Sequence, residues 1–150
     1  MAHTFTNLLF HIIFGTKDRY PFIEPELRPD LHAYVGGIVR EIGGAALSIG
    51  GTDDHIHILA KLPPVLAISN ALRLVKTNSS KWVREQRGMR SKFGWQSGFA
   101  AFSVSESSAR SVMRYIERQE AHHRKRTFAE EYIEFLEKNH IPYDPRYVFE

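Results

Sequence analysis

The stretch DDHIHILAKLPP, residues 53–64, decides the fold that we expect for this chain. Its apolar run is short, rich in isoleucine and leucine, and stops at a proline pair, which is typical of a β-strand. Side chains alternate between the two faces of a sheet, so His55 and His57 share one face, about 7 Å apart along the strand. The isoleucines that alternate with them point to the other face, where we expect helices. We interpret the histidine face as the open one.

Outward from this strand, the apolar pattern predicts three more strands and four helices. We expect strands over residues 7–16, 45–51, 55–62 and 98–105, helices over 24–44, 67–88, 107–123 and 127–140, and an extended tail over 141–150. The first six elements run β-α-β-β-α-β, which is the ferredoxin-like order of an α+β fold. We therefore predict a four-stranded antiparallel sheet with helices on one face, plus C-terminal helices.

The totals fit a single domain over residues 1–150. Of these residues 43% are hydrophobic, and no apolar run approaches the ~20 residues of a membrane span. The N-terminus has no basic leader with a small-residue cleavage site. The chain has no cysteine, which excludes disulfides, thiolate catalysis and cysteine zinc sites. We expect a cytoplasmic protein without a membrane partner.

Basic residues gather in two runs, although the formal net charge is only +3. The second run ends in Arg124, Lys125 and Arg126. The first consists of Arg73, Lys76, Lys81, Arg84, Arg87, Arg90 and Lys92. One such run alone is as readily a solvated helix face. Two runs flanking a candidate metal site favour a nucleic-acid partner.

The histidine pair is the candidate metal site. Two imidazoles on one strand face can share a divalent ion, but exposed strand histidines would have the same spacing. A third ligand must come from another element. Tyr115 and Gln119 are four residues apart on a predicted helix and His122 extends their face. Taken singly, Tyr115 is more readily a packing residue and Gln119 a surface residue.

Together these features resemble a known family. The segments FHIIFGTKDR, DDHIHILAKLPP, WQSGFAAFSVSESS and VMRYIERQ occur in this order. They resemble the single-tyrosine HUH transposases (histidine, hydrophobe, histidine) of the smallest bacterial insertion sequences and their REP-associated relatives. The resemblance covers about residues 8–120. A C-terminal helical extension, about residues 121–150, is similar to that of the longer, REP-associated or solitary members.

The resemblance implies a role for each residue of the site. His55 and His57 would be metal ligands, with Gln119 as the third, for Mg²⁺ or Mn²⁺. Tyr115 would be the nucleophile that breaks single-stranded DNA beside a hairpin, forms a 5′-phosphotyrosine and rejoins strands without a nucleotide cofactor. Members of the family are commonly homodimers, which implies an active site composed from two chains. The base that takes the tyrosine proton is not identifiable from the sequence.

Basic and aromatic side chains would then contact DNA. Trp82, Phe93 and Trp95 can stack on unpaired bases, although core packing is the preferred interpretation for both tryptophans. His11, on the first strand, is interpreted as structural or DNA-contacting and not as a ligand. The predicted DNA contacts are Lys17, Arg19, Arg73, Lys76, Lys81, Arg84, Arg114, Arg118 and His122.

Three alternatives remain open on the sequence. The extension favours a domesticated, REP-type endonuclease that processes dispersed hairpins. A nuclease with the same site and water as its nucleophile would keep cutting after Tyr115→Phe. A hairpin-binding module without chemistry would bind without metal and would not cut. Tyr132, Tyr143 and Tyr147 are also present, but none has a glutamine partner at the spacing of Tyr115, so we interpret them as packing residues.

Overall fold

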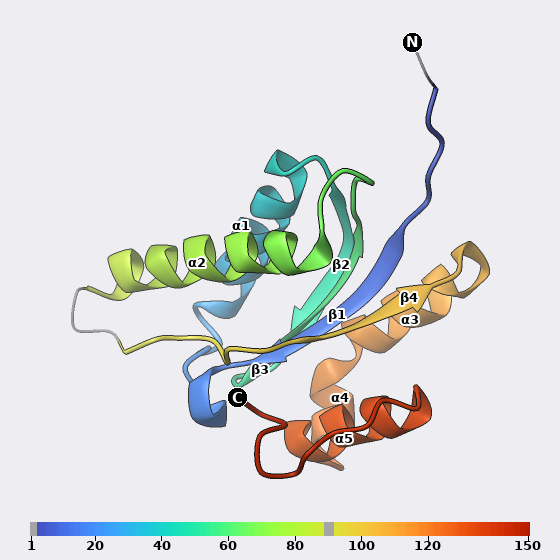
Figure 1. Ribbon diagram of the computed structural model, residues 1–150. Coiled ribbons are helices and arrows are strands. Elements are labelled where there is room, and N and C mark those ends of the chain that lie inside the picture. Colours follow the sequence, from blue (N-terminus) through green and yellow to red (C-terminus); the bar gives the residue numbers. More distant parts are fainter. Residues whose placement is uncertain (1–2, 89–91) are drawn as a thin grey trace.

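The computed structural model describes residues 3–88 and 92–150 (Figure 1). The strands are β1 (Leu9–Gly15), β2 (Ala45–Gly51), β3 (His55–Lys61) and β4 (Ala100–Val104). The helices are α1 (Arg28–Glu41), α2 (Ile68–Arg87), α3 (Ala109–Glu117), α4 (Gln119–His123) and α5 (Phe128–Lys138), with short 3₁₀ turns at Lys17–Arg19 and Glu106–Ser108. The predicted α+β fold is confirmed.

The four strands form one antiparallel sheet in the order β2-β3-β1-β4. The histidine strand β3 is therefore internal, between β2 and β1. His57 is paired with Ile13 on one side and with Gly50 on the other, and His55 is paired with Gly15. This register places His57 between two paired strands and His55 at the start of β3, paired with β1.

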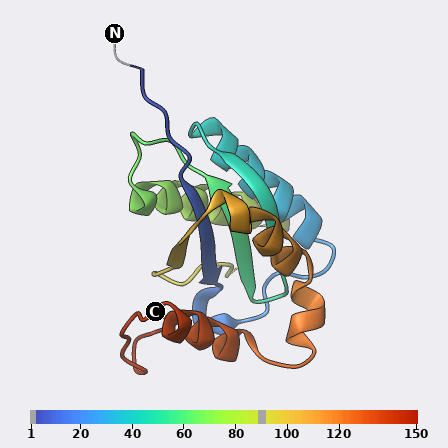
Figure 2. The same ribbon diagram turned by 90° about the vertical axis from the view of Figure 1, so that its right-hand side faces the viewer.

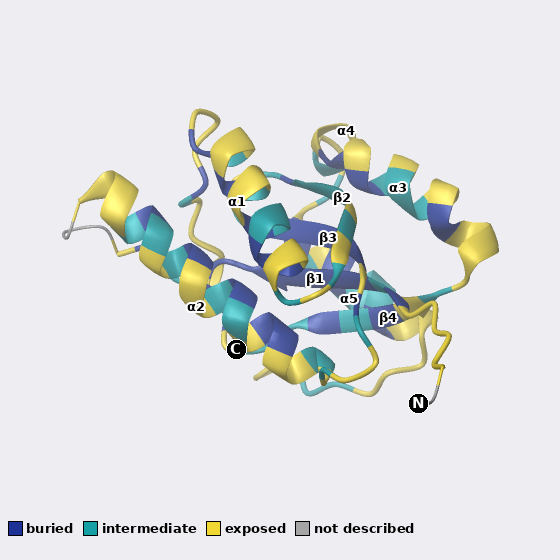
Figure 3. Cartoon of the chain, turned by 90° about the horizontal axis from the view of Figure 1, so that it is seen from above, coloured by how far each residue is buried: buried dark blue, intermediate teal, exposed yellow. Residues whose placement is uncertain are grey.

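The isoleucine face of the sheet packs against α1 and α2, as the alternation in β3 predicts. Ile12, Phe14, Ile56 and Ile58 meet apolar residues of these two helices, such as Val35. The four sheet residues are at most 2% exposed. Figure 3 shows the buried strands behind helices whose outer sides are exposed. This layer is the main core of the protein.

The prediction that the histidine face is open was wrong. Helices α3, α4 and α5 cover it (Figures 1 and 2), and His55 and His57 are 0% exposed. The ring of Phe128, at the start of α5, stacks on the ring of His55 with centroids 4.4 Å apart. Strand alternation gives the face on which a residue lies, but not what packs against it. Helix α3 and the C-terminal extension together bury this face.

Two other expectations differ from the structure. The helix predicted over 107–123 is two helices, because Arg118 has φ −102° and ψ 22°, outside the helical region, and separates α3 from α4. The tail predicted to be extended turns over residues 145–149. Its last residue, Glu150, lies beside the segment that precedes β4. There the Gly98 amide donates to the Glu150 carbonyl at 2.8 Å.

Gly50 on β2 permits the close approach of α3. A Cβ atom there would lie 2.3 Å from the carbonyl oxygen of Ile116, a backbone atom that cannot turn away. We expect Gly50→Ala to lower the free energy of unfolding by about 1–3 kcal/mol, as overpacking does. The measurement is urea denaturation followed by circular dichroism.

Gly36→Ala is the matched control. Its Cβ would lie 3.6 Å from the Ile49 side chain, an ordinary contact, inside α1. Alanine favours a helix interior over glycine by roughly 0.5–1 kcal/mol, so this variant should be as stable as the wild type or more stable. Equal stability of Gly50→Ala and Gly36→Ala would contradict the close packing of α3 on β2.

Candidate active site

Imidazole nitrogens from the central strand converge beneath the C-terminal helices. The Nε2 atoms of His55 and His57 point away from the sheet, toward α4 and α5. The Nε2 atom of His55 lies 2.8 Å from Oε1 of Gln119, and that of His57 lies 3.0 Å from Oε1 of Glu131. His55, His57 and Glu131 each present a ligand atom within 4.8 Å of the others, and all three are buried.

Gln119 and His123 complete this cluster from α4. The Nε2 atom of His123 lies 3.0 Å from Oε1 of Gln119 and 3.1 Å from Oε1 of Glu131. Of the three imidazole nitrogens, that of His123 lies within hydrogen-bond distance of both oxygen atoms, and those of His55 and His57 each lie within hydrogen-bond distance of one. We name His55, His57, Gln119, His123 and Glu131 the His-Gln-Glu cluster. Imidazole and carboxylate or amide oxygen are donors that one divalent ion accepts together.

Groups behind the cluster orient its histidines. Nδ1 of His55 lies 2.8 Å from a carboxylate oxygen of Asp54, and Nδ1 of His57 lies 2.8 Å from Nε2 of His11. An imidazole with a partner on its far nitrogen has a fixed ring orientation, and a carboxylate in that position makes it a better ligand. Asp54, the acid directly before the histidine motif, thus orients His55, and the buried His11 orients His57.

Both carboxylate oxygens of Glu131 have hydrogen-bond partners. Burial alone would raise its pKa, but hydrogen bonds from His123, His57 and Tyr115 hold it well below the usual range of a glutamate. Its Oε1 atom faces His57 and His123. Its Oε2 atom accepts from the Tyr115 hydroxyl and, at 3.2 Å, from the Gln119 amide. The residue is 0% exposed and charged at neutral pH.

Tyr115 lies at the edge of the cluster and is partly exposed. Its hydroxyl donates to Glu131 and accepts a hydrogen bond from Arg126 at 3.0 Å. Burial and the neighbouring Glu131 charge raise the pKa of Tyr115 above its usual value, while Arg126 opposes the shift. The ring of His122 stacks on that of Tyr115 with centroids 4.4 Å apart, and its Nε2 atom has no hydrogen-bond partner among the described residues.

The structure brings together the four residues singled out in the sequence. His55, His57, Gln119 and Tyr115 lie in one place, although Tyr115 and Gln119 are on successive helices and not on one. His123 and Glu131 were missed, and Arg126 was named only as a member of the second basic run. Glu131 did carry a signal, because it interrupts the apolar side of α5 formed by Phe128, Tyr132, Phe135 and Leu136. A charged residue on an apolar helix face needs a buried partner.

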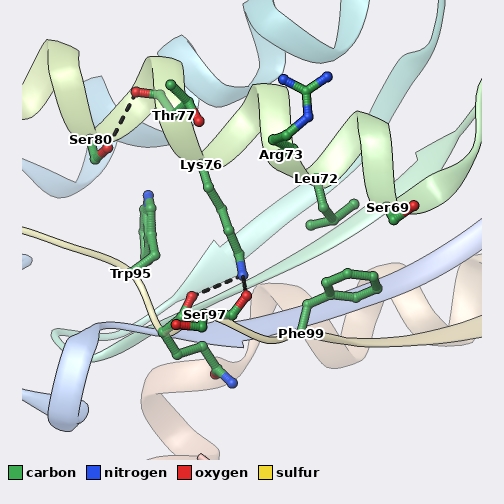
Figure 4. A pocket seen from close by; sticks show the side chains of 10 residues that line it. Ser69, Leu72, Arg73, Lys76, Thr77, Ser80, Trp95, Ser97 and Phe99 are labelled. Atoms are coloured by element: carbon green, nitrogen blue, oxygen red, sulfur yellow. Dashed lines mark hydrogen bonds between the residues drawn. The ribbon is translucent and has the colours of Figure 1, made fainter. Parts of the chain in front are cut away.

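The basic run of α2 lies elsewhere. Helix α2 packs on the isoleucine face, so Arg73, Lys81 and Arg84 are separated from the His-Gln-Glu cluster by the sheet (Figure 1). Arg73 and Lys76 line a pocket between α2 and residues 95–99 (Figure 4). There the Lys76 amine donates to the carbonyls of Gln96, Ser97 and Gly98, and burial lowers its pKa to about 8. Lys76 holds this segment in place.

The other predicted DNA contacts are at the surface or in the core. Lys17, Arg114 and Arg118 are exposed, and Arg90 lies outside the described residues. The Arg19 guanidinium stacks over the Phe149 ring at 4.2 Å, and Arg84 donates to the Phe93 carbonyl at 3.2 Å. The proposed stacking residues Phe93 and Trp95 are buried in the core, and Trp82 stacks on Tyr34. Core packing of the tryptophans agrees with the preferred interpretation.

The burial of His11 predicts that the folded protein loses stability in acid. Burial and the neighbouring His57 lower the pKa of His11 from 6.5 to about 3. The unfolded chain therefore binds this proton near pH 6.5, whereas the folded protein resists it until about pH 3. Stability should fall as the pH drops through this window, by about 3 kcal/mol between pH 7 and 4 from His11. The measurement is urea denaturation at a series of pH values without metal.

His11→Gln is the variant for this prediction, because glutamine keeps a nitrogen donor near His57 and does not titrate. The variant should be less stable than the wild type at pH 7, and the gap should narrow by about 3 kcal/mol at pH 4. A wild-type stability that is flat between pH 7 and 4 would contradict the buried neutral histidine.

Comparison with known proteins agrees with this fold. The family described as "Transposase IS200 like" matches residues 4–119. The transposase for insertion sequence element IS200 from Salmonella typhimurium is 30% identical over 128 residues, which are 79% of this chain and 81% of the relative. The ISDra2 transposase TnpA from Deinococcus radiodurans is 24% identical over 118 residues, which are 75% of this chain and 84% of the relative.

Two solved structures share the fold. One is a putative transposase from Deinococcus radiodurans, with a TM-score of 0.63, 20% identity, and coverage of 79% of this chain and 95% of the other. The second is a REP-associated tyrosine transposase bound to a REP hairpin, with a TM-score of 0.62, 14% identity, and coverage of 82% and 72%.

The membrane prediction was tested on the described part of the chain. Within residues 3–88 and 92–150, no helix is both long enough and apolar enough to cross a membrane.

The extent and identity of the sequence matches, taken with the shared sheet and helices, show that the chain belongs to the IS200-like transposase family.

Proposed function

We propose that this protein is a metal-dependent transposase of single-stranded DNA that uses Tyr115 as its nucleophile. The observation that carries the proposal is the position of the Tyr115 hydroxyl. It is hydrogen-bonded to the carboxylate that also contacts His57 and His123. A nucleophile beside a buried base and a set of metal-binding nitrogens is the arrangement that phosphodiester cleavage needs.

The His-Gln-Glu cluster fits a divalent ion. His55, His57 and Glu131 present their ligand atoms toward one point, and Gln119 presents its amide oxygen to the same place. Nitrogen and oxygen donors together suit Mn²⁺, and Mg²⁺ when DNA oxygens complete its shell. A bound ion would polarise the scissile phosphate and neutralise charge that develops on it.

Glu131 and Arg126 would activate the nucleophile. Tyrosine is mostly protonated at neutral pH, and the pKa of Tyr115 is raised further, so its proton must leave during attack. The Oε2 atom of Glu131 is positioned to accept it, and the Arg126 guanidinium would stabilise the phenolate oxygen. The phenolate forms a bond to phosphorus, the bond to the 3′ oxygen breaks, and that oxygen takes up a proton from water to become a 3′-hydroxyl. Reversal by another 3′-hydroxyl joins strands.

DNA must reach this site from the side of Tyr115. His55, His57 and Gln119 are at most 1% exposed, whereas Tyr115 and Arg126 are partly exposed. A phosphate that contacts both the tyrosine and the cluster requires α4 or α5 to shift, because their side chains fill the space. REP-type hairpins are the first substrates to test, since one structural relative is described as bound to a REP hairpin.

The nucleophile requires no second chain. Tyr115 and the His-Gln-Glu cluster belong to one chain and are in hydrogen-bond contact. We therefore propose attack within a chain, in place of the composite site that the family resemblance implies, and homodimer formation remains a separate prediction. Equal amounts of Tyr115→Phe and His57→Ala proteins, mixed before a cleavage assay, should stay inactive. Recovery of about a quarter or more of wild-type cleavage would indicate attack between chains.

The experiment for the proposed function is cleavage of labelled, hairpin-bearing single-stranded DNA. The full chain is incubated with each DNA in EDTA, Mg²⁺ or Mn²⁺, and the products are separated on a denaturing gel. We expect cleavage with metal only and a labelled band at the mass of the protein plus DNA. Cleavage without that band would indicate the nuclease that uses water, and tight binding without cleavage would indicate the binding module.

A further inference from the structure

A cavity lined by arginines adjoins the His-Gln-Glu cluster. It has a volume of about 530 Å³ and lies between the start of α1, the end of β2 and the α3–α4 junction, which are neighbours in Figure 2. Gln119 lines its wall and at the same time belongs to the cluster. The residues that the argument uses are Arg28, His32, Arg118, Gln119 and Arg124.

Two residues that line this cavity each carry a side-chain nitrogen without a hydrogen-bond partner among the described residues. Nε of Arg28 and Nε2 of His32 are buried and unpaired. Buried nitrogens almost always have a partner, so these two donors would gain one if a shift of either side chain opened it to a ligand in the cavity. Burial and the nearby Arg28 lower the pKa of His32 to about 4, so its imidazole is neutral at pH 7 and offers a hydrogen bond without charge.

The charges of the cavity favour an anion. Arg118 and Arg124 are exposed residues of its lining, and neither side chain has a hydrogen bond or ion pair with a described residue. Arg28 is paired with Glu120 at 2.9 Å. The acids here are Glu117 and Glu120, and the Glu120 side chain is 68% exposed, so it can leave Arg28 at little cost. Guanidinium groups with neutral donors are typical of phosphate sites.

We propose that this cavity binds a backbone phosphate of the DNA strand that Tyr115 cuts, close to the scissile phosphate. The inference rests on the proposed function and adds a second contact to it. The cavity and the cluster share Gln119, so a strand that lies on both would have a neighbouring phosphate fixed by arginine. That contact would set which phosphodiester faces Tyr115, because it fixes the strand along its length.

The test measures binding without requiring cleavage. Fluorescein-labelled (dT)₂₀ is titrated with the full-length Tyr115→Phe protein at several salt concentrations, with Arg118→Gln and Arg124→Gln added singly and together. Each lost phosphate contact should weaken binding roughly three- to tenfold at low salt. It should also lower the slope of log K against log salt by about 0.7. Thermal melts verify that each variant is folded.

Arg40→Gln is the matched control. Arg40 is exposed at the other end of α1, and its replacement by glutamine removes the same charge as the Arg118 and Arg124 variants do. Its (dT)₂₀ affinity should be close to that of the parent protein. Equal losses for Arg40→Gln and for the Arg118 and Arg124 variants would show that only net charge matters and would overturn the proposal.

Neutral methylphosphonate linkages locate the contact on a DNA that the wild-type protein cuts. One linkage beside the scissile phosphate should slow cleavage by wild type and cause no further slowing in the Arg118→Gln, Arg124→Gln protein. A further loss at every position would overturn the assigned contact. If the wild type cuts no DNA but the arginine variants lose (dT)₂₀ affinity and salt dependence, the phosphate site stands and the proposed function fails.

Discussion

Replacement of Tyr115 by phenylalanine should abolish both the protein–DNA adduct and strand joining. Loss of the nucleophile in a covalent enzyme lowers the rate on the order of 10⁶-fold, and we expect cleavage here to fall by at least about 10⁴-fold. The fold should survive, because the ring remains and Glu131 keeps its contacts with His57 and His123. The measurement is the rate of single-turnover cleavage in the presence of the metal ion that the wild-type protein requires.

Tyr143→Phe is the control for this prediction. Its hydroxyl also donates to a glutamate, Glu137 at 2.9 Å, but this hydrogen bond is exposed to solvent, and the Tyr143 ring packs with the apolar residues of α5. We expect wild-type cleavage and adduct formation from this variant. Cleavage by Tyr115→Phe within tenfold of the wild-type rate would show that water, or another tyrosine, is the nucleophile.

Replacement of Glu131 by glutamine should have the second largest effect. The side chain keeps its shape, but the charge that faces the histidines and the base that faces Tyr115 are both lost. General-base catalysis is typically worth 10²–10⁴-fold, and we expect cleavage to fall by about 10³-fold. Mn²⁺ affinity, measured by calorimetry, should also fall, because a neutral amide replaces a negatively charged ligand.

Gln119→Ala separates the two possible sources of a third ligand. It removes an oxygen that faces His55 and His123 but leaves Glu131 charged. If Glu131 is a ligand, Mn²⁺ affinity should fall more in Glu131→Gln than in Gln119→Ala. Glu137→Gln, on the exposed side of α5, is the matched control and should bind Mn²⁺ as the wild type does. Wild-type cleavage by Glu131→Gln would contradict both roles of this carboxylate.

Local periodicity predicted much of this site. Alternation in β3 placed His55 and His57 on one face, and helical spacing placed Tyr115 and Gln119 within reach of each other, despite the break at Arg118. These patterns depend only on neighbours in the sequence. They therefore give the elements and their faces, and the known order of elements gives the sheet.

The rest depends on contacts that are distant in sequence. Glu131 and Arg126 lie 16 and 11 residues beyond Tyr115, and the α4–α5 connection brings them to its hydroxyl. No periodicity predicts how that connection turns. The same packing buries the histidine face, which strand alternation alone presented as open. The charged residue on the apolar side of α5 was the one local sign of this contact.

The most direct test of Tyr115 as nucleophile is a map of the covalent adduct. Wild-type protein is incubated with a hairpin-bearing single-stranded DNA and Mn²⁺, the DNA is digested, and the peptides are analysed by mass spectrometry. We predict that one peptide carries a nucleotide linked through a 5′-phosphate to Tyr115, and that EDTA prevents its formation. A nucleotide on any other residue, or efficient cleavage with every peptide unmodified, would contradict the mechanism proposed for this protein.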